Sequence, residues 1–135
     1  MLERKTRTVQ RKIKAVGEDV LNVQKDIGEL LSKPIEPGDA GAVFRCRLLL
    51  NRCRAMEEEL TRLFMELPEK RSAAISGSLC IQNKQLIELQ RSTLNTLLES
   101  LKRSENALDE AKRMELLAES ISIGERIKKN VRKNH

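Results

Sequence analysis

Three cysteines and one histidine are the residues of this sequence best suited to metal binding or nucleophilic chemistry. Cys46, Cys53 and Cys80 show no Cys-X-X-Cys spacing, and the single histidine, His135, is the last residue. On one helix Cys46 and Cys53 would lie about 10 Å apart, which is too far for a disulfide. An odd number of cysteines without a signal-peptide pattern is typical of a reducing compartment. We therefore expect buried, inert thiols and no metal site.

The sequence also lacks residues suited to acid–base catalysis or phosphate binding. No histidine is placed for general-base work, and no glycine-rich loop ends in Lys-Ser or Lys-Thr. Carboxylate pairs such as Glu57-Glu58 and Asp109-Glu110 stand among basic neighbours, a pattern typical of salt-bridged surface. The sequence predicts that the protein is not an enzyme and that it has no cofactor and no small-molecule substrate.

The elements that carry these residues are predicted to be helices. Charged residues make up 34% of the chain, and Phe44 and Phe64 are its only aromatic residues. This composition disfavours a β-sandwich or an α/β enzyme and favours a coiled coil or helical bundle. The predicted fold class is all-α: one domain over residues 1–135, an antiparallel three-helix bundle or coiled coil with a long overhanging C-terminal helix.

Proline and glycine divide the chain into three predicted helices, over about 2–32, 40–67 and 72–133. Pro34, Pro37 and Gly38 break the first helix from the second, and Asp39 offers an N-terminal cap. Pro68 ends the second helix. Residues 72–78 consist mostly of serine, alanine and glycine. Gly77 within them is expected to be a hinge or part of the N-terminal cap of the third helix.

The first two helices carry apolar residues in alternating steps of four and three, as in a coiled-coil seam. In the first helix the seam residues are Val9, Ile13, Val16, Val20, Val23, Ile27 and Leu30. In the second they are Ala42, Cys46, Leu49, Cys53, Met56, Leu60, Leu63 and Leu67. Phe44, Leu48, Leu50 and Phe64 lie beside the second seam and are expected to broaden its apolar face.

The third helix continues the pattern beyond the reach of the first two. Its repeat slips phase near Ala111. A helix of this length exposes a stripe that its own chain cannot cover, and such stripes mark partner sites. The predicted partner-helix interface consists of Ile87, Gln90, Leu94, Leu97, Leu101, Ser104, Leu108, Ala111, Met114 and Leu117. Gln90 and Ser104 either set register and partner choice within this seam or face solvent because the true seam is offset.

The formal net charge of +6 comes mainly from the two ends of the chain. Residues 1–14 carry six basic residues and one acidic residue. Because aromatic stacking platforms are missing, nucleic-acid binding is disfavoured. An anionic membrane surface is the other partner that such ends could meet. The candidate contacts at the C-terminal end are Arg126, Lys128, Lys129, Arg132 and Lys133.

The third helix resembles a SNARE of the Qb class. The stretch runs from Gln90-Arg91-Ser92-Thr93-Leu94 through Leu101 and Lys112-Arg113-Met114 to Ile123-Gly124. The resemblance implies a three-helix regulatory bundle, a heptad motif with a central glutamine and a C-terminal membrane anchor. In one register Gln90 is the central glutamine. In the other, Ile123-Gly124 is the family's Ile-Gly element and the chain ends before the central layer.

The sequence thus predicts a non-enzymatic helical module that associates with partner helices, in vesicle fusion or tethering. A self-associating structural coiled coil and a basic binder of nucleic acid or lipid surfaces remain the alternatives. No stretch approaches the roughly 18 consecutive apolar residues of a membrane span. The expected location is therefore the cytoplasm, either free or at the periphery of a membrane.

Overall fold

Helices account for almost all of the residues that the computed structural model describes, namely 2–36 and 38–133. The elements are α1 (Leu2–Ser32), α2 (Ala40–Glu66), the short 3-10 helix η1 (Arg71–Ala73) and α3 (Ala74–Lys133). The prediction of an all-α chain is confirmed. The helix ends lie within two residues of the bounds expected from proline and glycine.

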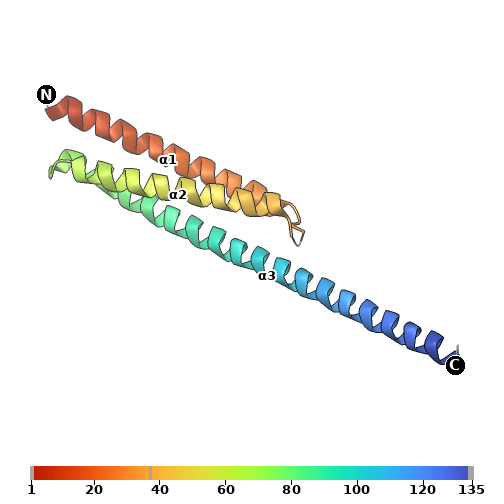
Figure 1. The fold of residues 1–135 in the computed structure, drawn as a ribbon. Coiled ribbons are helices and arrows are strands. Elements are labelled where there is room, and N and C mark those ends of the chain that lie inside the picture. The colour runs from red at the N-terminus through yellow and green to blue at the C-terminus, as the bar shows by residue number, and fades with distance from the viewer. Residues whose placement is uncertain (1, 37, 134–135) are drawn as a thin grey trace.

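The three helices lie side by side, and each contacts the other two (Figure 1). α2 runs back along α1, and α3 returns in the direction of α1. The N-terminal end of α1 therefore lies beside the turn between α2 and α3. At 1.5 Å per residue α3 is about 90 Å long, roughly twice the length of either neighbour. Its C-terminal part extends alone beyond the connection between α1 and α2 (Figure 1).

Local signals in the sequence account for both connections. The Asp39 carboxylate accepts a hydrogen bond from the backbone N–H of Ala42 at 3.1 Å, so the predicted cap of α2 is confirmed. Gly38, just before it, has φ of 79°, a left-handed conformation that favours glycine. The second connection corrects one expectation. α3 begins at Ala74, so Gly77 lies inside the helix, against Phe64, and does not form its cap.

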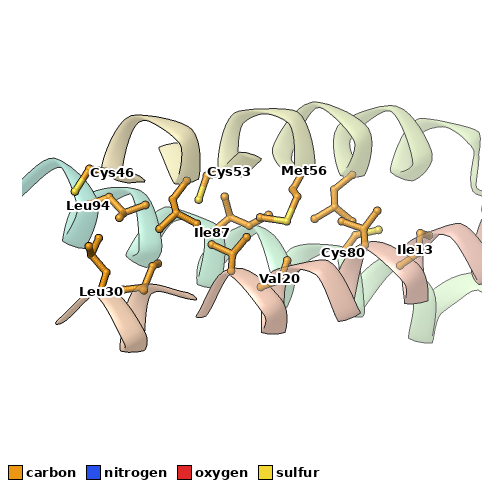
Figure 2. Close-up of a cluster of buried hydrophobic side chains, with 14 of the residues drawn as sticks. Ile13, Val20, Leu30, Cys46, Cys53, Met56, Cys80, Ile87 and Leu94 are labelled. Carbon is orange, nitrogen blue, oxygen red and sulfur yellow. The ribbon is translucent and has the colours of Figure 1, made fainter. Parts of the chain in front are cut away.

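One apolar core runs between the helices, and Figure 2 shows side chains from all three converging on it. All seven predicted seam residues of α1 are buried, and so are the first seven of α2. Of the off-seam residues of α2, only Leu50 broadens this core, since it is partly buried and packs against it, whereas Phe44, Leu48 and Phe64 are exposed. From η1 and α3 the buried residues are Ala73, Cys80, Asn83, Ile87, Gln90, Leu94 and Leu101.

Leu94 and Leu89 offer a matched test of this packing, since both are leucines on α3. Leu94 is 0% exposed and Leu89 is 66% exposed. Leu94→Ala should lower the free energy of unfolding by about 2–5 kcal/mol, through lost burial and the cavity left behind. Leu89→Ala should change it by less than about 0.5 kcal/mol. Urea denaturation followed by circular dichroism measures both, and equal losses would show that α3 does not pack through Leu94.

Candidate partner-binding surface

The predicted interface on α3 is divided by the fold into a covered part and an open part. Ile87, Gln90, Leu94 and Leu101 are buried within this chain, against α1 and α2. Leu97 and Ser104 are half-buried. The four buried residues are therefore closed to a partner in this arrangement, so the expectation of a free seam does not hold for them, whereas Leu97 and Ser104 are partly open. Substituting Leu94 and Leu101 by Asp would disrupt the core and would not report on partner binding.

The remaining four predicted residues lie at or beyond the end of the core. Leu108 is exposed and lies beside Gly38 in the α1–α2 connection. Ala111, Met114 and Leu117 are exposed on the part of α3 that extends alone. We call residues 109–133 the projecting segment. At 1.5 Å per residue it is about 37 Å long.

Gln90 is a buried polar residue whose hydrogen bonds are made inside this chain. Its side-chain Nε2 donates to the Val20 carbonyl oxygen at 3.0 Å and to Gln24 Oε1 at 3.2 Å. Its Oε1 lies 3.8 Å from Cys53 Sγ, a weak thiol donor. One side chain thus joins all three helices. Of the two interpretations of Gln90, exposure to solvent is excluded, and the contacts favour a role in register.

A second buried amide lies one heptad earlier, at Asn83. Its Nδ2 is buried without a hydrogen-bond partner among the described residues. Gly17 of α1 faces it closely: a Cβ at residue 17 would lie 3.1 Å from Asn83 Nδ2. Glycine therefore permits the close approach of α1 and α3 at this level. An unpaired buried amide costs about 1–3 kcal/mol, so this layer weakens the core.

Two ion pairs between helices involve residues next to members of the Gln90 layer, since Arg52 precedes Cys53 and Arg91 follows Gln90. Arg52 on α2 pairs with Asp26 on α1 at 2.7 Å, and Arg91 on α3 pairs with Glu57 on α2 at 2.6 Å. All four side chains are about two-fifths exposed, so each pair contributes little free energy. Both pairs form in the same alignment of the three helices that allows the Gln90 hydrogen bonds.

The projecting segment presents large apolar side chains that nothing in the described chain covers. Each of them is more than half exposed. They are Met114, Leu116, Leu117, Ile121, Ile123, Ile127 and Val131. The predicted interface contained only Met114 and Leu117 of this set. The others lie outside it because the interface was assigned only as far as Leu117, although the phase slip near Ala111 was visible in the sequence.

Four of these apolar residues point away from the direction of the core. Met114, Leu117, Ile121 and Val131 lie about 120° or more around α3 from Leu101, whereas Leu116, Ile123 and Ile127 lie within about 80° of it. Leu117 follows Leu101 by sixteen residues, which at about 100° per residue turns its side chain by about 160° around α3. Leu101 points toward α1 and α2, where it is buried. Leu117 therefore lies on nearly the opposite side of the same helix. α3 thus carries a buried face up to Leu101 and, after the phase slip predicted near Ala111, a second apolar line that includes Leu117 and has a different orientation.

The predicted basic contacts lie at the far end of the projecting segment. Arg126, Lys128, Lys129 and Arg132 are exposed. The side chain of Lys133 lies outside the described residues, as does His135. Nowhere in the described chain does a helix combine the length and apolarity of a membrane-crossing segment.

The three cysteines lie in the apolar core. Cys46, Cys53 and Cys80 are free and buried, which confirms their predicted role in the core. Burial raises the pKa of each thiol; at Cys53 it outweighs the opposing effect of the nearby Arg91 and Arg52. Within the described residues no group of His, Cys, Asp and Glu side chains could hold a metal ion.

Comparison with protein-family models, with curated proteins and with solved structures finds no match to this chain.

Two substitutions at Gln90 should show whether its buried amide stabilises the core or only specifies the register of the helices. Gln90→Ala removes the side chain from Gln24 and opens a cavity, and should cost about 2–4 kcal/mol in urea denaturation. Gln90→Met keeps the volume without the polar group and should be nearly neutral. A loss from Gln90→Met as large as that from Gln90→Ala would instead show that the hydrogen bonds dominate.

The buried thiols should be protected from reagents and should make stability fall in alkali. With raised pKa values in the fold, the thiols favour folding below their unfolded pKa. That stability is lost as pH rises from the unfolded toward the folded pKa. Ellman's reagent at pH about 8 should label the native chain at least about a hundredfold more slowly than the urea-unfolded chain. Equal rates would contradict the burial of all three.

Proposed function

We propose that this chain is a non-enzymatic helical interaction module whose projecting segment binds partner helices. The observation that carries the proposal is the apolar surface of residues 114–131, which lies outside the core and is left open by α1 and α2. Isolated helices are marginal in water, and most helical stability in proteins comes from packing. A projecting helix with this apolar content would gain stability from a neighbour that buries it.

The finer architecture belongs to the same proposal. The mutual contacts of α1, α2 and α3 and their alternating seams support an antiparallel three-helix bundle with coiled-coil packing, built as one domain. In this proposal the bundle is the base that holds the projecting segment away from its own core. Self-association of the projecting segment is one form that such pairing can take.

The resemblance of α3 to Qb-class SNAREs suggests vesicle fusion or tethering as the process served. In that setting the module would be cytoplasmic and membrane-peripheral. The basic residues Arg126, Lys128, Lys129 and Arg132 support a membrane-facing tip, because cationic side chains are attracted to anionic lipid. The alternative of a basic surface binder predicts liposome or duplex binding that weakens steeply with salt.

A paired set of variants tests the proposed surface. Leu117→Asp with Ile121→Asp places two charges on the apolar face. Ala118→Asp with Ser122→Asp adds the same charge one residue further along, about 100° around the helix. Cross-linking mass spectrometry in cells should show that the first pair loses helical partners at residues 109–133 while the second keeps them.

Both pairs should leave the bundle intact, because all four residues are exposed and lie beyond the core. Urea denaturation of the Leu94-containing core should therefore be unchanged to within about 0.5 kcal/mol. Partners retained equally by both pairs would show that this apolar face is not the binding surface.

A further inference from the structure

We infer that the projecting segment pairs with the projecting segment of a second copy of this chain, and that the two helices run antiparallel. This inference rests on the proposed function and names the partner of the same surface. Three features of residues 109–132 support it: a seam with coiled-coil spacing, opposite charges at the two ends, and small and large residues at complementary positions.

The seam is a second heptad line, separate from the one that fills the core. Met114, Leu117, Ile121, Gly124, Lys128 and Val131 follow one another in steps of three, four, three, four and three. Such steps keep a stripe facing one neighbouring helix. The stripe faces away from α1 and α2, so a second chain can cover it while the core stays closed.

The two ends of the projecting segment carry opposite charge. Residues 109–119 contain four acidic and two basic residues, a net charge of −2. Residues 120–132 contain one acidic and four basic residues, a net charge of +3. A parallel pair would place basic end against basic end. An antiparallel pair places the basic end of each copy beside the acidic end of the other, which is the complementary arrangement.

The seam residues also fit the antiparallel direction. If Ile121 lies opposite the second copy's Gly124, then Leu117 lies opposite Lys128 and Met114 opposite Val131. Gly124 has no side chain, and no atom of this chain lies within 4 Å of where its Cβ would be, so the second copy's Ile121 can approach its backbone.

The parallel direction gives worse layers along the same seam. Two Lys128 ammonium groups would meet in one layer, and two Gly124 residues would leave a void in another. In the antiparallel layer each Lys128 can cover Leu117 with its aliphatic stem while its ammonium group stays in water. Ile127, beside the seam, adds apolar area at the edge.

Charge reversal in the full-length chain tests the direction of pairing. The tip-reversed variant carries Arg126→Glu, Lys129→Glu and Arg132→Glu; the base-reversed variant carries Asp109→Lys, Glu115→Lys and Glu119→Lys. All six positions are exposed and lie off the seam. In sedimentation experiments the unmodified chain should dimerise with a micromolar Kd. Each variant alone should dimerise at least about tenfold more weakly, because like charges then face each other.

The chain with all six substitutions should recover the unmodified Kd to within about threefold, because its ends are again opposite in charge. Failure of the combined chain to recover would overturn the antiparallel direction. An unmodified chain that stays monomeric throughout the micromolar range would overturn pairing between copies. The partner-loss experiment with Leu117 and Ile121 would still decide the proposed function, because it detects any helix bound to this face.

Engineered cysteines give a second readout of direction. Across an antiparallel pair, two residues 114 lie about 25 Å apart, while residue 114 lies beside the second copy's residue 131. Met114→Cys alone and Val131→Cys alone should therefore form no disulfide dimer, whereas an oxidised mixture of the two should. The buried native thiols do not compete. A disulfide dimer from Met114→Cys alone would show a parallel pair and contradict the inference.

Discussion

The mismatch in helix length governs this molecule. α1 has 31 residues and α2 has 27, whereas α3 has 60. Two short helices can bury only the part of a long one that lies beside them, so the core ends near Leu101 and Leu108. Everything beyond that point must remain exposed or find cover from outside. The division into a packed part and an open part therefore follows from chain length and from the position of Pro34 and Pro68.

Within the packed part, small and polar residues let three helices approach closely while fixing how they align. Gly17 admits Asn83, and the Gln90 amide reaches both the Val20 carbonyl and Cys53. A core of aliphatic side chains alone would tolerate a shift by one heptad, because one layer resembles the next. The Gln90 layer and the ion pairs Arg52–Asp26 and Arg91–Glu57 make one register more favourable than its neighbours.

The helices and the core residues were largely predictable, because both depend on local signals. Proline, glycine and the Asp39 cap mark the helix ends, and alternating steps of four and three identify the buried seams of α1 and α2. The availability of the α3 seam was not predictable. Whether Leu94 meets its own chain or a partner depends on how far α1 and α2 extend along α3. The phase slip near Ala111 was visible in the sequence, but the interface was assigned only as far as Leu117, so Leu116 and the exposed apolar residues from Ile121 to Val131 were left out of it.

Because of that change of phase, the buried seam of α3 and the seam of the projecting segment face in different directions. If the heptad line of Ile87, Leu94 and Leu101 had continued, a partner helix would have met α1 and α2 at the end of the core. The seam of Met114, Leu117 and Ile121 is turned by about 140–160° from Leu101, so this seam opens to the other side of α3. A second helix can then approach without displacing α1 or α2, and no core contact needs to break. Binding would therefore draw only on exposed apolar area and charge, and the full stability of the bundle would be retained in the complex.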